Sequence, residues 1–228
     1  RAGGPRTWWG AVSGRVNWEH VGPDRPGPPA LHLRLANLAF ANPDLAGTAY
    51  GTYTHTGQGP GTIDLSAHLS RADAKQVPRY MPLVLSEKLR KWLDNAIVEG
   101  AASDVRLRLR GDLHDFPFIN PAKGQFQVNA KVHKGILDYV DGWPRMEDIE
   151  ADLLFERDRA EIVGRKARIF GAALSGVRVS IPHLARGVIN VSGQADGRAA
   201  HCLLDTRQRP VRRRISGFPD ALPAPGPG

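Results

Sequence analysis

The stretch that decides the fold runs from Pro78 to Phe118 and reads PRYMPLVLSEKLRKWLDNAIVEGAASDVRLRLRGDLHDFPF. In its first half, apolar residues recur at three- and four-residue steps, which predicts an amphipathic helix. Ser86 suits the N-cap of this helix, and Gly100 suits its C-terminal stop. The apolar stripe comprises Leu85, Leu89, Trp92, Leu93, Ala96 and Ile97.

The second half of the stretch changes to a period of two, which predicts a β-strand. Val105, Leu107 and Leu109 form one face, and the strand ends at Gly111 and Asp112. The other face carries Arg106, Arg108 and Arg110. We expect these arginines to face solvent and some of them to pair with acidic side chains across the strand. Contact with lipid phosphates is the alternative.

Alternating segments of the same kind continue on both sides of this stretch. They are separated by turns rich in Gly, Pro, Asn and Asp, at a spacing of about 8–12 residues. Because no crossover helices join them, the order predicts a mainly β fold: a curled antiparallel sheet, shaped like a groove or half-barrel. One helical excursion near 71–99 interrupts the strands, and Ser70 to Asp73 resembles its start.

Composition limits the possible classes of protein. The chain has 228 residues, 41% of them apolar, and 31 Lys and Arg against 23 Asp and Glu give a net charge of +8. Cys202 is the only cysteine, which excludes an internal disulfide and a cysteine-based zinc site. No apolar run is long enough to span a membrane. We expect no nucleic-acid partner, because aromatics for base stacking are not set among the arginines.

The chain divides by composition into two parts. Residues 1–197 carry the strand pattern and are expected to form a single β-rich unit. Residues 198–228 are basic and rich in Pro and Gly, which predicts a poorly structured tail. The chain begins at Arg1 with no leader, so we expect it to be a segment of a longer protein.

Several linked phrases carry a resemblance to a known family. The segments RYMPLVLSEKLRKWLDNAIVEGAASDVRLRLRGDLHDFPF and GQFQVNAKVHKGILDYVDGWPRMEDIEADLLFE resemble the central region of the YhdP branch of the AsmA-like proteins. The similarity runs from about Leu31 to Gly197. It implies a periplasmic β-structure with an apolar groove, anchored in the inner membrane upstream of Arg1. It also implies phospholipid transfer toward the outer membrane, with other envelope proteins as possible partners.

Signatures of catalysis are absent from the sequence. It contains no His-Glu-x-x-His, no Gly-x-Ser-x-Gly and no phosphate-binding loop. The acidic residues that could act as acid–base pairs are explained by strand ends and solvent-facing positions; they are Asp112, Asp115, Asp148, Glu150 and Asp152. We therefore expect no enzyme activity, no cofactor and no metal.

The central question is what the apolar face of the sheet contacts. A helix of about four turns cannot cover a sheet of about ten strands. The first interpretation is a phospholipid groove lined by Ile63, Leu65, Leu69, Val105, Leu107, Leu109, Phe126, Val128, Val132, Ile149, Leu153, Phe155, Val177 and Val179. The alternative is a closed β core in a periplasmic scaffold or assembly factor that acts by protein contact.

Overall fold

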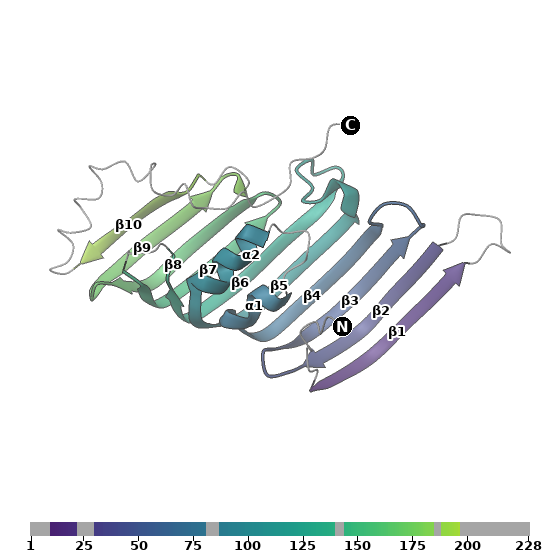
Figure 1. The fold of residues 1–228 in the computed structure, drawn as a ribbon, viewed down its shortest axis with the longest axis horizontal. Coiled ribbons are helices and arrows are strands. Elements are labelled where there is room, and N and C mark those ends of the chain that lie inside the picture. The colour runs from purple at the N-terminus through teal and green to yellow at the C-terminus, as the bar shows by residue number, and fades with distance from the viewer. Residues whose placement is uncertain (1–9, 22–29, 81–86, 140–143, 185–187, 197–228) are drawn as a thin grey trace.

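The computed structural model describes residues 10–21, 30–80, 87–139, 144–184 and 188–196. It contains one antiparallel sheet in which ten strands lie in sequence order, from β1 to β10 (Figure 1). The strands are β1 (Ala11–Val21), β2 (Ala30–Ala41), β3 (Leu45–His55), β4 (Thr62–Asp73), β5 (Ile97–Asp112), β6 (Gly124–Leu137), β7 (Met146–Glu156), β8 (Arg159–Ile169), β9 (Ala172–Ile181) and β10 (Asn190–Asp196).

The sheet is open and does not close into a barrel. Within the described ranges β1 pairs with β2 alone, and β10 pairs with β9 alone. The predicted mainly β fold with an antiparallel curled sheet is therefore confirmed. The predicted tail, residues 198–228, lies outside the described residues.

Bulges interrupt the ladder and bend the strands. Register shifts occur where a non-glycine residue has positive φ, at Asn37 in β2, Asp104 in β5, Lys134 in β6 and Asp148 in β7. A bulge adds one residue to one strand, which bends that strand and increases the local twist. These bulges give a physical reason for the curl of the sheet.

A helical segment joins β4 to β5, as predicted, but its bounds differ. It consists of a 3-10 turn (Ala74–Gln76), α1 (Val77–Tyr80) and α2 (Glu87–Ala96). We call the described residues of this stretch, 74–80 and 87–96, the helical segment. Figure 1 shows α1 and α2 lying over one face of the sheet, near one end of the central strands.

The prediction was wrong at both ends of the excursion. β4 continues to Asp73, whose side chain accepts a hydrogen bond from the backbone of Lys75 and caps the 3-10 turn. The predicted helix start at Ser70 is therefore still strand. At the other end, α2 stops at Ala96 and β5 begins directly, so Gly100 lies inside a strand rather than ending the helix. Ser86 lies outside the described residues.

Candidate functional site: the apolar face of the sheet

The register places a continuous apolar row across the sheet. Each member lies directly opposite the next on the neighbouring strand, from β2 to β9. We call this the central row, and it comprises Leu38, Ala49, Ala67, Leu107, Val128, Phe155, Ala160 and Ile181. At about 4.8 Å between strands, the row is about 34 Å long.

Parallel rows flank the central row on the same face. Leu65 lies opposite Leu109, which lies opposite Phe126, while Leu153 lies opposite Ile162. The alternation along each strand then brings the whole predicted groove lining onto this apolar face: Ile63, Leu65, Leu69, Val105, Leu107, Leu109, Phe126, Val128, Val132, Ile149, Leu153, Phe155, Val177 and Val179.

Every one of these lining residues is half-buried: none is fully buried and none is fully exposed. Side chains inside a two-layer core are normally buried, because a second layer packs on them. The observed values fit side chains that touch their lateral neighbours and leave their tips accessible. At the edge of the sheet, Val16 on β1 is 50% exposed and Trp18 is 73% exposed.

Sequence reasoning missed the small members of the face. Ala49, Ala67 and Ala160 belong to the central row, but the predicted lining contained only large aliphatic and aromatic residues. It also lacked two large members of the row, Leu38 and Ile181. On β3 the inward positions also include Gly47 and Gly51, so the hydrophobic alternation that identifies a strand face is weak there. The strand β4 has a strong alternation, and its pairing with β3 would have identified the inward positions of β3.

The helical segment packs on this same face at one end of the strands. Tyr80 of α1 packs against a buried cluster of Leu45, Ala72 and Ala102, and Leu69 and Val105 from the apolar face pack against the same cluster. The Tyr80 hydroxyl accepts a hydrogen bond from Asn42 Nδ2 at 2.8 Å and donates one to Asp44 Oδ2 at 2.8 Å. Burial is the largest cause that raises the pKa of Tyr80.

The turn between β2 and β3 holds α1 in place. Asn42 is only 5% exposed, and its side-chain oxygen accepts the backbone N–H groups of Asp44 and Leu45 at 3.0 and 2.8 Å. Arg71 donates to the carbonyls of Asn42 and Pro43, which ties β4 to the same turn. The position of α1 is therefore fixed by hydrogen bonds as well as by packing.

α2 is held by packing and by hydrogen bonds to a residue that follows β6 and to the 3-10 turn. The predicted contact stripe is partly confirmed, since Ala96 is buried and Trp92 and Leu93 are half-buried. Trp92 Nε1 donates to the Tyr139 carbonyl, which follows β6, at 3.3 Å. Lys75 Nζ donates to the Asp94 carbonyl at 2.8 Å and links the 3-10 turn to α2.

An aromatic loop, residues 113–123 between β5 and β6, covers the opposite end of the apolar face. Phe118 is 0% exposed and lies against Gly111 and Gly124, where an added Cβ would come within 2.7 and 2.5 Å of its ring. Phe116 packs against Phe118 and against Phe126, with ring centroids 6.0 and 5.0 Å apart. The glycines thus provide the space in which this loop folds back onto the sheet.

The other face of the sheet is polar and extensively paired. Arg108 forms an ion pair with Asp64 across β4 and β5, and Arg110 lies 3.8 Å from the same carboxylate. The hydrogen bond from Arg108 is the main cause that lowers the pKa of Asp64. Arg106 donates to Asp104 at 2.9 Å. The expectation of acidic partners on the neighbouring strand is therefore confirmed for Arg108 and Arg110, whereas Arg106 pairs with Asp104 on its own strand.

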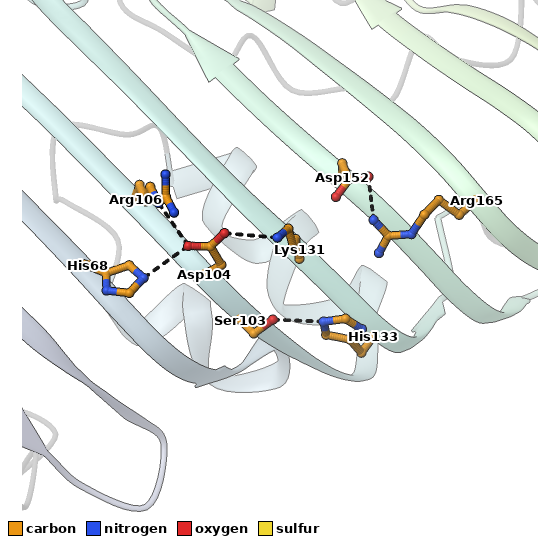
Figure 2. A network of polar contacts seen from close by, with 8 residues as sticks. All are labelled: His68, Ser103, Asp104, Arg106, Lys131, His133, Asp152 and Arg165. Atoms are coloured by element: carbon orange, nitrogen blue, oxygen red, sulfur yellow. Dashed lines mark hydrogen bonds and ion pairs between the residues drawn. The ribbon is translucent and has the colours of Figure 1, made fainter.

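Asp104 is the centre of a cross-strand network on this polar face (Figure 2). Its carboxylate contacts His68 on β4 at 3.2 Å and Lys131 on β6 at 3.1 Å, in addition to Arg106. Lys131 is the largest cause that lowers the pKa of Asp104. Arg165 pairs with Asp152 between β8 and β7. These contacts join adjacent strands in a sheet that has no second described sheet packed against it.

Ser103, His133 and Glu150 form a hydrogen-bonded series on the polar face. Ser103 Oγ lies 2.9 Å from His133 Nε2, and His133 Nδ1 lies 2.8 Å from Glu150 Oε2 (Figure 2 shows the first contact). The order matches a hydrolytic triad, which in addition requires donors arranged for an oxyanion and a substrate pocket at the nucleophile.

Two hollows lie on the polar face of the described sheet, and Ser103 lines neither of them. A shallow depression of about 650 Å³ is lined mainly by polar residues of β3 to β6, among them Tyr50, Arg106, Gln127 and Asn129. A smaller one of about 330 Å³ lies beside Asp104 and Lys131. Glu150 also accepts the backbone N–H of Lys134, the largest cause that lowers its pKa. We therefore interpret the series as a connection between strands at the bulge of β6.

Neither metal clusters nor membrane-spanning helices occur in the described part of the chain. Its His, Cys, Asp and Glu side chains form no group able to hold a metal ion. None of its helices has the length and apolar character needed to cross a bilayer.

Comparison with known proteins agrees with the resemblance seen in the sequence. No curated protein and no solved structure matches the chain. The family model described as YhdP protein matches residues 8–228, which is nearly the whole chain. The chain therefore belongs to the YhdP family.

Proposed function

We propose that this chain is a segment of a bacterial envelope protein that carries phospholipid acyl chains along the apolar face of its sheet. The single observation that carries the proposal is the central row, a continuous apolar path from β2 to β9 on an open sheet. Membership of the YhdP family supports a place in the bacterial envelope.

The energetic reason for such a path is the cost of exposing hydrocarbon to water. Burying one methylene contributes about 0.8 kcal/mol, so a sixteen-carbon chain exposed to water costs about 12 kcal/mol. A continuous apolar surface removes this barrier along its length. The headgroup remains in water at the open side, and no bond is made or broken.

The proposal requires no catalytic residue and no cofactor. In this account the polar face stabilises the single-layer sheet, and the apolar face binds the lipid. The compartment we propose is the periplasm, with the full protein anchored in the inner membrane and moving phospholipid between the inner and outer membranes. Contacts with other envelope proteins are compatible with this role, and nucleic acid is not a proposed partner.

The alternative of a scaffold with a closed core predicts a covered apolar face. In the described residues the sheet is single, and its predicted groove lining is half-buried throughout. This observation favours the lipid groove over the closed core.

The proposal is tested by native mass spectrometry of the chain purified without detergent and incubated with phosphatidylglycerol vesicles. We expect masses that correspond to protein with bound phospholipid. A variant with a single charge on the central row, Val128→Asp, should lose these adducts while circular dichroism still reports the sheet. A folded wild-type chain that never carries phospholipid would refute the proposal.

A further inference from the structure

The helical segment and the aromatic loop lie at opposite ends of the same strands. At one end Tyr80 packs on the same buried cluster as Val105 and Leu69, and at the other Phe116 packs on Phe126, which lies opposite Leu109. Both elements lie on the apolar face, so that face is bounded on two sides over β4 to β6. Between the two boundaries, Leu107 and Val128 of the central row form the floor.

The positions of these contacts set the width of the floor. Val105 and Leu109 are four residues apart on β5, and at about 3.4 Å per residue they are about 14 Å apart. Acyl chains at van der Waals contact are separated by about 4 to 5 Å from each other and from each wall, so about two chains fit side by side between the walls.

The edges of the sheet lack such boundaries among the described residues. Val16 and Trp18 on β1 are at least half exposed, and Val191 on β10 is 67% exposed. Val179 on β9 lies opposite Val191 and belongs to the apolar face, and it is half-buried. The apolar face is therefore narrow at its centre and open toward both edges.

We infer that the helical segment and the aromatic loop form the walls of a fixed-width passage over β4 to β6, which selects lipids by their number of acyl chains. This inference rests on the proposed function and adds its specificity. Lipids with two chains fit between the walls with the chains across the strands, whereas a lipid with four chains does not. Phe116 is the wall residue whose removal widens the passage, and Phe118 is the residue that anchors the loop.

The walls are held in ways that make the width a property of the fold. The hydrogen bonds of Tyr80 with Asn42 and Asp44 hold one wall, and the burial of Phe118 on Gly111 and Gly124 holds the other. Neither wall depends on bound lipid for its position.

The experiment places the photo-cross-linker benzoylphenylalanine at Val128, inside the passage, or at Val179, outside it. Each protein is incubated with vesicles containing either phosphatidylglycerol or cardiolipin, which share phosphoglycerol headgroup chemistry but have two and four chains. Leaving even about two methylenes of an excluded chain in water lowers occupancy about tenfold. We therefore expect labelling at Val128 to fall about tenfold or more from the two-chain to the four-chain lipid, and labelling at Val179 to stay the same within about twofold.

The matched variant Phe116→Ala widens the passage and should restore labelling of Val128 by cardiolipin. Circular dichroism and the unchanged labelling of Val179 verify that this variant folds. If both sites take both lipids equally in the wild-type chain, the passage is not selective and the inference fails while the proposed function stands. If neither site takes either lipid, the proposed function itself fails.

Discussion

The two faces of this sheet are formed by the same strands but differ in how their side chains are paired. On the polar face many charges have a cross-strand partner, as Asp64 has with Arg108 and Asp104 with Lys131. On the apolar face the residues of the central row lie opposite one another, and no second sheet packs on them in the described residues. The comparison indicates that the polar face supplies part of the stability that a second layer normally supplies, which leaves the apolar face available.

The largest expected effect comes from placing the same charge on either face of β6. Val128→Asp puts a carboxylate on the central row, where contact with hydrocarbon costs several kcal/mol. Asn129→Asp puts it one residue away, on the polar face near Arg106 and Lys131. Native mass spectrometry should show lost phospholipid adducts for the first variant and wild-type adducts for the second. Equal loss in both would show that lipid does not distinguish the faces.

The next largest effect is a loss of folding stability when the aromatic loop that bounds the apolar face is overpacked. In Gly124→Ala the new Cβ would meet the Arg110 carbonyl oxygen at 2.4 Å and the Phe118 ring at 2.5 Å. Overpacking of this kind costs about 1–3 kcal/mol, measurable by urea denaturation. Gly10→Ala is the control and should cost less, because Gly10, like Gly124, does not have positive φ, and its new Cβ would meet no atom closer than 3.4 Å. An unchanged free energy of unfolding in urea for Gly124→Ala would show that Phe118 is not confined there.

A comparable effect is expected at the turn that holds α1. Asn42→Ala removes two accepted backbone hydrogen bonds and the bond donated to Tyr80. Loss of buried partners costs about 1–3 kcal/mol in the free energy of unfolding. Tyr80→Phe removes only the hydroxyl and should cost about 0.5–1.5 kcal/mol. If the two variants were equally stable, the turn would not depend on Asn42.

Acid should affect the polar face and leave the apolar face unchanged. The pKa values of Asp64, Asp104 and Glu150 are lowered by their partners in the folded state. Their stabilisation is therefore complete above the ordinary values of 3.8 for Asp and 4.5 for Glu, and is lost as the pH falls through the lowered folded-state values. Denaturant melts from pH 7 to 3 should show stability falling below about pH 4.5, less steeply in Glu150→Gln. A fall already complete at pH 6 would contradict this origin.

The smallest effect is expected from Ser103→Ala. If the Ser103–His133–Glu150 series only connects strands, the variant should lose about 0.5–1.5 kcal/mol of stability, the usual contribution of one hydrogen bond. Phospholipid adducts should be unchanged. Covalent labelling of wild-type Ser103 by a fluorophosphonate, absent from His133→Ala, would instead show that the series acts as a nucleophile.

The sequence predicted what depends on local periodicity. The alternation of Leu107 with Arg106 and Arg108 identified both faces of β5, and the turn signals predicted the antiparallel order. The start of the helical segment was harder to predict, because Asp73 can cap a helix and can also end a strand. The prediction extended the helix to Gly100, whereas the chain becomes a strand at Ile97 without a glycine stop.

Other features depend on which strands lie side by side, and periodicity does not contain that information. Leu38 and Ala49 became part of the site only when the register placed them opposite one another, in line with Ala67. The fold of the aromatic loop onto Gly111 and Gly124 joins residues that a local pattern treats as separate turns. A single sequence therefore predicted the faces of the sheet but not the walls at its ends.

The central claim is that lipid lies on one face of this sheet, and the periodicity of contact along β6 tests it most directly. Benzoylphenylalanine would be placed at each position from Phe126 to Lys131 in turn, and cross-linking to phosphatidylglycerol measured by mass spectrometry. We predict labelling at Phe126, Val128 and Ala130, and background levels at the positions between them. Labelling of equal intensity at adjacent positions, or labelling confined to Gln127, Asn129 and Lys131, would contradict the account.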